Sequence, residues 1–230
     1  MSKNHLIGNK TKTTADTVAN SLREKILRGE LEDAQGLRQD KIAKKFGVSS
    51  IPVREALFQL AVEGLVAFVP NRGAFVAPLL AKDVFEIYAM RNVLEMLALE
   101  HAVPHLTDSA LARAEGILVQ MDPEKDIYKW GELNWEFHAT LYQPADMPRL
   151  MDTLRSLHVN VIRYLVRNVP TPDDIEYRSN NQIEHRQILE ACRQRDTEIA
   201  CIQLRRHLDA SSRMLVRFLK SEDGVDSKDE

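Results

Sequence analysis

A helix end and a helix start lie only a few residues apart in the segment FGVSSIPVREAL, residues 46–57. Gly47 can adopt the left-handed backbone conformation in which helices commonly end. Ser49 or Ser50 can cap the next helix, and Pro52 fits its first turn, where the missing amide hydrogen costs little. The segment therefore predicts two short helices joined by a tight turn, as in a helix-turn-helix motif.

The flanking sequence predicts the rest of a small domain. The stretch TADTVANSLREKILRGEL is periodic like an amphipathic helix, and LVAFVP and AFVAPL are typical of two strands joined by the turn PNRG. We therefore predict a winged helix-turn-helix over residues 14–78, after a disordered tail at 1–13. A three-helix bundle with a hairpin and no DNA role is the alternative. The inward stripe of the third helix consists of Ala56, Leu57, Leu60 and Ala61.

From about Leu80 onward the sequence predicts only helices. Six or seven helical stretches follow one another, separated by prolines at 104, 123, 144, 148, 170 and 172. They predict an all-helical bundle over residues 79–220. The last residues, SEDGVDSKDE, are acidic and lack apolar anchors, so we expect a disordered tail at 221–230. The predicted fold class is thus mainly α, a winged helix-turn-helix followed by an all-α bundle.

Charge is distributed unevenly along the chain. Residues 1–78 hold 12 Lys and Arg against 8 Asp and Glu, whereas the remainder holds 19 against 26. A basic first part and an acidic remainder suggest two units with different partners. The sequence shows no apolar run long enough to span a membrane, no apolar signal core, and no CxxC spacing for Cys192 and Cys201. We expect a cytoplasmic protein with reduced thiols and no membrane partner.

The run VSSIPVREALFQLAVEGLVAFVPNRGAFV resembles the DNA-binding signature of the GntR family of bacterial transcription regulators. The helical remainder, with FHATL near its middle and EHRQILEA further on, resembles the FCD effector domain (FadR C-terminal type). Together the resemblances cover roughly residues 14–220. They imply a homodimer that binds a palindromic double-stranded DNA operator and changes its affinity when a small metabolite, often a carboxylic acid, enters the bundle.

The resemblance also implies which residues meet DNA. Arg54 lies one turn into the third helix, where its guanidinium can bond two acceptors on a guanine edge. Ser49 and Ser50 can bond phosphates, and the wing turn with Arg72 and Gly73 can reach the minor groove or the backbone. Four residues of the second helix either attract phosphates or form a solvated face: Arg38, Lys41, Lys44 and Lys45.

Two positions depart from the family pattern. Family members commonly have arginine where Ser50 stands, and some have a basic residue near the position of Asp40. With both absent, Arg54 becomes the main candidate for direct base reading, and the operator sequence is harder to infer.

Three histidines, His138, His185 and His207, fall on apolar faces of predicted helices. Asn134 faces the same way as His138, four residues later. These four residues match the family pattern of an Asp or Asn and three histidines that bind a divalent metal. Zinc fits this set first, with nickel or manganese as alternatives, and positions stay open for a carboxylate. The neutral amide should weaken metal binding and favour an anionic ligand. Satisfied core histidines are the alternative interpretation, which we adopt for His158.

Arg91 lies among apolar residues of the first long helix, where a buried guanidinium needs an anion. It can clamp the carboxylate of an effector, or it can pair with Glu95 one turn later. We hold both interpretations open.

Two other classes of function compete with an effector-controlled regulator. A metal-dependent hydrolase could use Glu136 or Glu184 as a base, but HExxH, nucleophile-elbow and phosphate-loop motifs are absent, and an enzyme would not explain the winged helix. In a metal sensor the bound ion itself would be the signal. We predict a regulator and not an enzyme. The sequence names neither the metabolite, nor the operator, nor whether the protein acts as a repressor or an activator.

Overall fold

The computed structural model describes residues 12–168 and 171–223, and the chain divides into two compact units. One unit contains the chain up to Ile26 together with Leu31–Ala77, and the other contains Leu27–Glu30 and the chain from Pro78 onward. The predicted tails at 1–13 and 221–230 lie mostly outside the described residues. Within those residues, no helix combines the length and apolar character that a membrane span requires.

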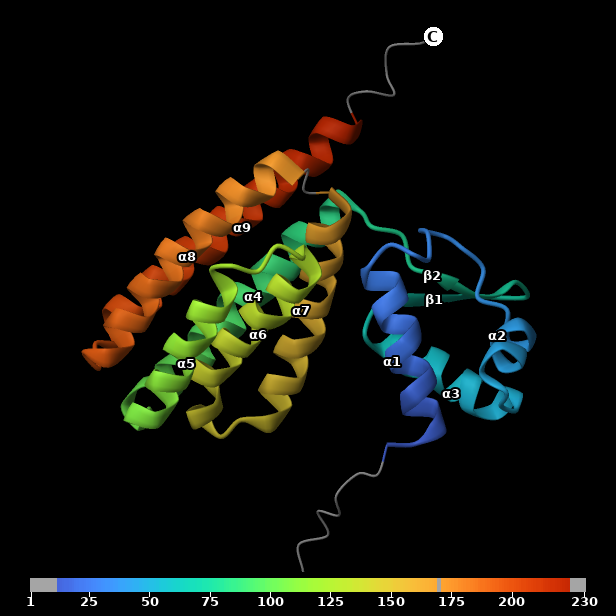
Figure 1. The fold of residues 1–230 in the computed structure, drawn as a ribbon, viewed down its shortest axis with the longest axis horizontal. Coiled ribbons are helices and arrows are strands. Elements are labelled where there is room, and N and C mark those ends of the chain that lie inside the picture. Colours follow the sequence, from blue (N-terminus) through green and yellow to red (C-terminus); the bar gives the residue numbers. More distant parts are fainter. Residues whose placement is uncertain (1–11, 169–170, 224–230) are drawn as a thin grey trace, which may run out of the picture. The chain divides into compact units, whose positions relative to one another are not determined.

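The first unit consists of three helices and a two-stranded wing (Figure 1). The strands pair antiparallel, from Val66 opposite Val76 to Val69 opposite Gly73. This architecture confirms the predicted winged helix-turn-helix. Its elements are α1 (Thr14–Leu27), α2 (Gln39–Phe46), α3 (Ser50–Val62), β1 (Val66–Val69) and β2 (Gly73–Val76).

The turn between α2 and α3 forms where predicted, but without the predicted side-chain cap. Gly47 ends α2 in the left-handed region, with φ of 66°. Ser49 occupies the N-cap of α3 with extended backbone, yet its hydroxyl makes no capping hydrogen bond. An N-cap hydroxyl usually accepts from the second or third amide of the helix, and here the third position is Pro52, which has no N–H. Ser49 therefore occupies the N-cap position as predicted, but the hydrogen bond expected of its side chain is absent.

The core of this unit comes from α1, α3 and the wing. Three members of the predicted inward stripe of α3 are fully buried, and Ala61 is half-buried. The residue Val53, which the sequence analysis did not single out, is buried with them. By contrast, α2 has no fully buried residue, so its polar side chains lie open to solvent. A bidentate pair from Arg23 to Glu63, with Nε 2.6 Å from Oε2, ties α1 to the end of α3.

The second unit is helical throughout its described residues, which confirms the predicted all-α bundle (Figure 1). The two longest helices, α8 and α9, run side by side as an antiparallel hairpin, and α9 also packs along α4. Short 3-10 turns follow α4 and α6 at Val103–His105 and Gln143–Ala145. The helices are α4 (Ala81–Ala102), α5 (Asp108–Met121), α6 (Ile127–Tyr142), α7 (Pro148–Asn168), α8 (Thr171–Arg193) and α9 (Thr197–Asp223).

Close contact between α6 and α7 fixes the rotation of α6. A Cβ on Gly131 would lie only 2.9 Å from Cγ1 of Ile162, so the two helices approach more closely than a larger residue allows. Nε2 of the buried His158 donates to the carbonyl oxygen of Gly131 at 2.9 Å. His158 is therefore a satisfied core residue, as expected from the sequence.

Two glycines in helices offer a matched pair of substitutions. Gly116→Ala places its methyl group in open space on α5 and should raise the free energy of unfolding by up to about 1 kcal/mol. Gly131→Ala gains the same helix propensity, but the overpacking against Ile162 should cost about 1–3 kcal/mol. Both tryptophans of the chain lie on α6, so denaturant unfolding followed by tryptophan fluorescence reports the helical unit. Equal stability of the two variants would contradict the close contact.

Candidate functional site

The exposed face of α3 presents Arg54, the residue predicted to read bases. Its guanidinium carbon lies 5.5 Å from the centre of the Phe58 ring, one turn further along the helix. Phe58 in turn stacks on Phe68 of β1, with ring centroids 4.7 Å apart. This cation–π contact restrains Arg54 before any partner arrives. Ser49 and Ser50 are exposed at the start of the same helix, where phosphate-binding groups are expected.

The wing loop presents Arg72 in a similar way. Its side chain is exposed, and its guanidinium carbon lies 5.4 Å from the centre of the Phe75 ring in β2. Gly73 has φ of 93°, a conformation that other residues adopt only with strain, so the loop geometry depends on glycine. These supporting aromatic residues were not predicted, although the four-residue spacing of Arg54 and Phe58 is a signal for such a contact.

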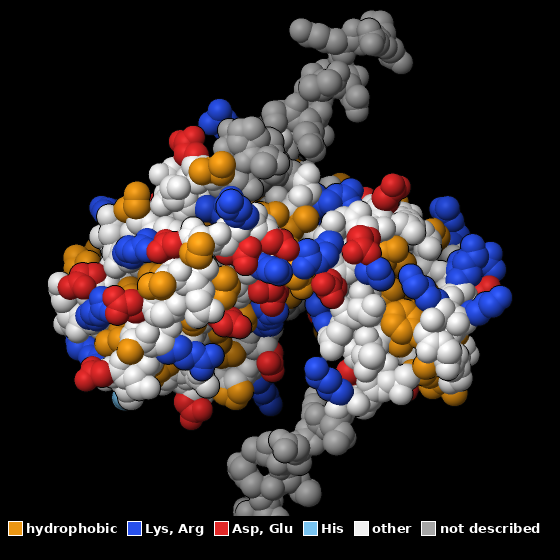
Figure 2. Space-filling model, viewed as in Figure 1, with side chains coloured by type: hydrophobic (Ala, Val, Ile, Leu, Met, Phe, Trp, Pro, Cys, Tyr) orange, Lys and Arg blue, Asp and Glu red, His pale blue; other side chains and the backbone are white. Residues whose placement is uncertain are grey.

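Basic side chains of α2 complete this surface. Lys41, Lys44 and Lys45 are exposed, and Figure 2 shows Lys and Arg side chains gathered at the right-hand edge, where Figure 1 places α2 and the wing. Nη2 of Arg38 lies 2.9 Å from Oδ2 of Asp40, and this hydrogen bond lowers the pKa of the Asp40 carboxyl. Both side chains are about two-thirds exposed, so salt screens the pair and a phosphate can compete for Arg38.

The second unit brings three histidines from three helices together. His138 on α6, His185 on α8 and His207 on α9 are all buried, and one ring nitrogen from each lies within 4.8 Å of the others. Burial, reinforced by the neighbouring histidines, lowers the pKa of His138 and His185 well below the ordinary value. Neutral imidazoles with free lone pairs are the form that binds divalent cations. We refer to His138, His185 and His207 as the tri-histidine centre.

Three buried polar atoms fit a cation, two on the tri-histidine centre and one on Asn134, a turn before His138. Among the described residues, Nε2 of His138, Nε2 of His185 and Oδ1 of Asn134 are buried and have no hydrogen-bond partner. Nearly all buried polar atoms in proteins have a partner, so such a group of atoms indicates a ligand. Imidazole nitrogens with an amide oxygen suit zinc, nickel or manganese.

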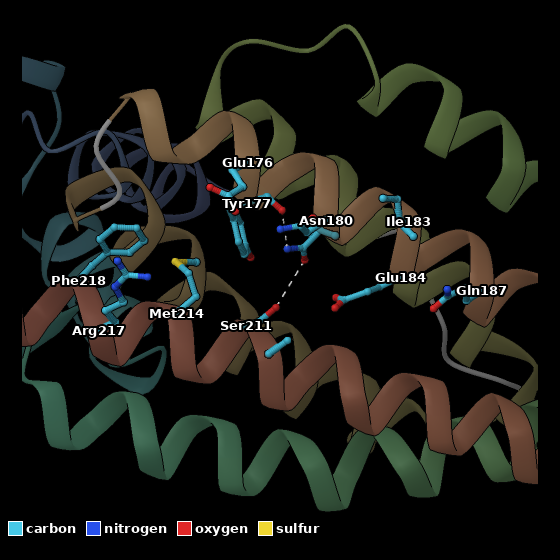
Figure 3. Close-up of a pocket in the computed structure, with 12 residues that line it drawn as sticks. Glu176, Tyr177, Asn180, Ile183, Glu184, Gln187, Ser211, Met214, Arg217 and Phe218 are labelled. Carbon is cyan, nitrogen blue, oxygen red and sulfur yellow. Dashed lines mark hydrogen bonds between the residues drawn. The ribbon is translucent and has the colours of Figure 1, made fainter.

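Glu184 lies between the tri-histidine centre and a cleft formed by α8 and α9. Its Oε2 lies 2.8 Å from Nδ1 of His207, and its side chain also lines the cleft, which has a volume of about 500 Å³ (Figure 3). The buried Tyr177, Asn181 and Ser211 line the inner part of this cleft. From its sequence, Glu184 was expected only as a possible hydrolase base, whereas the structure places it against Nδ1 of His207, a candidate ligand.

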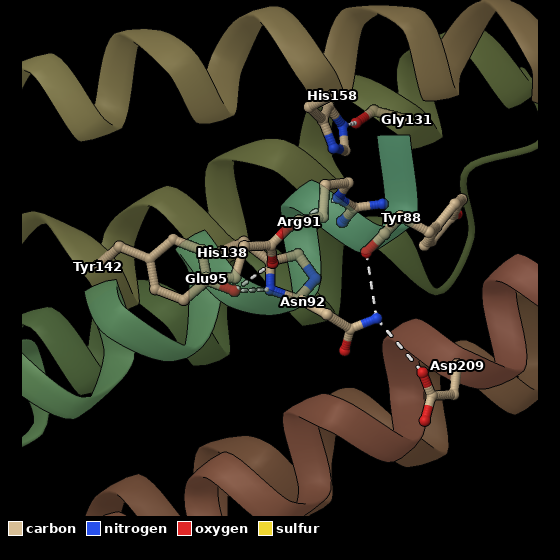
Figure 4. Close-up of polar contacts among 9 residues, drawn as sticks. All are labelled: Tyr88, Arg91, Asn92, Glu95, Gly131, His138, Tyr142, His158 and Asp209. Carbon is tan, nitrogen blue, oxygen red and sulfur yellow. Dashed lines mark hydrogen bonds and ion pairs between the residues drawn. The ribbon is translucent and has the colours of Figure 1, made fainter. Parts of the chain in front are cut away.

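The buried Arg91 pairs with Glu95, one of the two interpretations that the sequence left open. Nε of Arg91 lies 2.6 Å from Oε1 of Glu95, and both side chains are about 4% exposed (Figure 4). The other oxygen of Glu95 accepts from the Tyr142 hydroxyl at 2.6 Å, and that hydroxyl lies 3.1 Å from Nδ1 of His138. Burial, with Glu95 beside it, raises the pKa of Tyr142 well above the ordinary value, so the hydroxyl keeps its proton. The chain of contacts links Arg91 to the tri-histidine centre.

His185 of the tri-histidine centre also has a hydrogen-bond partner. Nδ1 of His185 lies 3.3 Å from Oε1 of Gln182, whose amide nitrogen donates to the Leu118 carbonyl and to Asp122. The sequence analysis missed Glu95 as a neighbour of Tyr142, and it missed Gln182. A three- or four-residue spacing marks the pairs within one helix, but nothing in the sequence indicates the contact between Glu95 and Tyr142.

Comparison with known families assigns both units. Residues 14–76 match the family described as "Bacterial regulatory proteins, gntR family", and residues 86–210 match the FCD domain. The chain is 31% identical to an uncharacterized HTH-type transcriptional regulator of Bacillus subtilis, YdhC, over 79% of this chain and 81% of that protein. It is 27% identical to the HTH-type transcriptional repressor RspR of Escherichia coli, over 93% of each.

Solved structures agree with this assignment. A GntR-family transcriptional regulator from Pseudomonas syringae pv. tomato is 31% identical and superposes with a TM-score of 0.54, covering 91% of this chain and 87% of that one. McbR/YncC of Escherichia coli has a TM-score of 0.73 at 23% identity, covering 90% of this chain and 99% of that one, and it shows the same fold.

Acidification should destabilise the helical unit. Burial lowers the pKa of His138, His158 and His185 well below the ordinary value of 6.5. Below pH 6.5 the unfolded chain therefore binds more protons than the folded one, and stability falls as the pH falls towards the lowered pKa values. Each histidine contributes up to about 1.4 kcal/mol per pH unit. Urea unfolding of chelator-treated protein at pH 7.5 and 5.5, followed by tryptophan fluorescence, measures the effect.

Matched variants assign the pH dependence to the buried histidines. His158→Gln keeps an amide that can donate to the Gly131 carbonyl. It should reduce the change in unfolding free energy per pH unit by about the contribution of one histidine. His101→Gln, at an exposed position near the end of α4, should leave the slope unchanged. Stability that rises on acidification would show that the buried imidazoles are not neutral in the folded unit.

Proposed function

The chain belongs to the GntR family of bacterial regulatory proteins and carries an FCD domain, so it is a DNA-binding transcriptional regulator. We propose that it acts as a homodimer on a palindromic operator under the control of a small organic acid. The families and relatives that it matches are regulators and not enzymes. The proposal therefore concerns how DNA, a metal ion and an effector are bound.

At the operator, Arg54 is the proposed base-reading residue. The N-terminal part of the second helix of a helix-turn-helix enters the major groove, and a guanidinium there can bond O6 and N7 of guanine. Exposure of Arg54 and its restraint by Phe58 support this role. Ser49, Ser50 and the basic residues of α2 would hold phosphates, while Arg72 and Gly73 would bring the wing to the minor groove or the backbone.

The exposed side of α4 supports a dimer of the helical units. Four apolar side chains on one side of this helix are between 39% and 71% exposed: Phe85, Met90, Val93 and Leu97. Apolar side chains that cluster on a surface in this way commonly mark a protein interface. A second copy of the chain would cover them, and two-fold symmetry would present two α3 helices to the half-sites of a palindrome.

The tri-histidine centre, together with Asn134, would hold a divalent cation, with zinc as the first candidate and nickel or manganese as alternatives. When bound, such a cation supplies a positive centre that attracts a carboxylate. Because the proposed side-chain ligands are all neutral, the ligands themselves would not reduce the attraction for an anionic effector. Arg91 would contribute a second positive charge, although an effector carboxylate would compete with Glu95 for it.

The observation that carries the effector and metal proposal is the convergence of three buried imidazoles with a partnerless amide oxygen one turn from one of them. The alternative regulator, a metal sensor, shares this site but responds to the ion alone. A weakly held ion would favour the sensor because Asn134 adds no charge.

Replacing Arg54 with Ala should remove about 1–3 kcal/mol of base discrimination. An operator first selected in vitro from random DNA with the wild-type protein, then titrated with each variant, provides the measurement. Lys45→Ala should weaken binding to all sequences alike. It should also reduce the slope of log affinity against log salt concentration by about 1, the contribution of one phosphate contact. Arg113→Ala, an exposed arginine on α5, serves as the control and should change neither. Unchanged selectivity of the Arg54 variant would exclude α3 as the reading helix.

Metal removal distinguishes the two kinds of regulator. Operator affinity is measured with chelator-treated protein, with zinc added, and with zinc plus a panel of small carboxylic acids. An effector-controlled regulator should respond to an acid only when the ion is present, whereas a sensor should respond to zinc alone. The variant His185→Ala should abolish either response and retain DNA binding, because the ligand belongs to the helical unit. A response that persists in this variant would place the effector elsewhere.

A further inference from the structure

Each imidazole of the tri-histidine centre has a hydrogen-bond partner at Nδ1. The Tyr142 hydroxyl lies 3.1 Å from Nδ1 of His138, the Glu184 carboxylate 2.8 Å from that of His207, and the Gln182 amide oxygen 3.3 Å from that of His185. For His138 and His185 the other nitrogen, Nε2, is buried without a partner among the described residues. The same pattern on three different helices calls for a common explanation.

The position of the proton on His138 follows from counting donors. Tyr142 has a single hydroxyl proton, and its 2.6 Å contact with the carboxylate of Glu95 uses that proton because an ionised carboxylate can only accept. The other oxygen of Glu95 accepts from Nε of Arg91 at 2.6 Å, so both oxygens of this side chain act as acceptors. The tyrosine oxygen must then accept from His138, so the proton lies on Nδ1 and the lone pair on Nε2.

The other two imidazoles follow by the same reasoning. The carboxylate of Glu184 accepts from Nδ1–H of His207. The amide nitrogen of Gln182 donates to the Leu118 carbonyl and to Asp122, so its oxygen faces His185 and accepts from Nδ1–H. In their neutral forms all three rings therefore have a proton on Nδ1 and a lone pair on Nε2.

We propose that Tyr142 with Glu95, Gln182 and Glu184 are positioning residues that fix all three imidazoles in the tautomer with a free Nε2, so that the tri-histidine centre is arranged for a divalent cation before the cation binds. This inference rests on the proposed metal-binding function. Ligand histidines whose other ring nitrogen is hydrogen-bonded bind metal more tightly, and removing such a partner typically costs ten- to a hundredfold in affinity.

Glu184 has a second role that Glu95 does not share. The charge of Glu95 is balanced by Arg91 at 2.6 Å. Glu184 contacts only His207 among the ion pairs that the described residues form. Because Asn134 offers a neutral oxygen where a carboxylate could stand, Glu184 is the group that supplies negative charge next to the centre. Gln at position 184 would keep an acceptor for Nδ1–H but lose this charge, and Leu would lose both.

The first test observes the tautomers directly in metal-free protein. Chelator-treated full-length protein labelled with 15N-histidine is examined by long-range 1H–15N correlation, which distinguishes protonated from unprotonated ring nitrogens. His138, His185 and His207 should have a protonated Nδ1, whereas His158 should show the opposite tautomer because its Nε2 donates to the Gly131 carbonyl. In Tyr142→Phe, the signal of His138 should shift to a mixture of tautomers, while those of His185 and His207 should not.

The second test measures affinity for Zn2+ by competition with a fluorescent chelator. Tyr142→Phe and Glu184→Leu should each bind about ten- to a hundredfold more weakly than wild type. Glu184→Gln should lose less than Glu184→Leu and should retain the wild-type tautomer of His207. Tyr128→Phe, at the opposite end of α6, and Glu190→Gln, exposed on α8, are matched controls that should bind as wild type does.

The outcomes separate this inference from the proposed function. Weak Zn2+ binding by wild type itself, at a level that His185→Ala does not reduce further, would overturn the metal site and this inference with it. Tight binding by wild type, with unchanged tautomers or affinity within twofold in both Tyr142→Phe and Glu184→Leu, would overturn only the positioning roles. Tryptophan fluorescence confirms that each variant is folded, and Glu184, about a quarter exposed, tolerates substitution better than the buried Tyr142.

Discussion

A buried ion pair between Arg91 and Glu95 is the contact on which the arrangement of the helical unit depends. Removing one partner of such a pair typically costs about 3–5 kcal/mol, because the remaining charge is left in a medium that cannot solvate it. Here both residues belong to α4, one turn apart, so the pair forms within a single helix. The free oxygen of Glu95 then holds Tyr142 of α6, which fixes one helix against the other. The contact between Gly131 and α7 restrains the same face of α6 about three turns earlier, and His138 lies between Gly131 and Tyr142 along the helix.

In both units, neighbouring side chains restrain the candidate functional residues before any ligand binds. A charged or polar group with several rotatable bonds costs entropy when a ligand immobilises it, and that cost falls if neighbours already hold it. In the DNA-binding unit the neighbours are aromatic rings, Phe58 for Arg54 and Phe75 for Arg72. In the helical unit they are the hydrogen-bond acceptors at Nδ1 of the three histidines.

Sequence reasoning predicted the elements better than the contacts between them. Gly47, Pro52 and the periodic apolar stretches determine local backbone geometry, so the helix-turn-helix, the wing and the bundle could be predicted. The N-cap position of Ser49 was predicted, whereas its missing side-chain hydrogen bond was not, although Pro52 removes one of the two amides that usually donate to an N-cap hydroxyl. The histidines were recognised through a family resemblance, since spacings of 47 and 22 residues indicate nothing alone. The link from Glu95 to Tyr142, also 47 residues apart, was not predictable, because only the packing of α4 against α6 creates it.

The stack formed by Arg54, Phe58 and Phe68 has a consequence for transferring sequence preference between members of the family. Phe58 belongs to α3 and Phe68 to β1, so the orientation of Arg54 depends on both α3 and the wing. Grafting α3 alone into another regulator would remove Phe68, on which Phe58 stacks. The Phe58 ring, and the Arg54 side chain in contact with it, would then be less restrained. If Arg54 reads bases as proposed, operator preference would be encoded by the winged motif as a whole, and the exchangeable unit would be larger than α3.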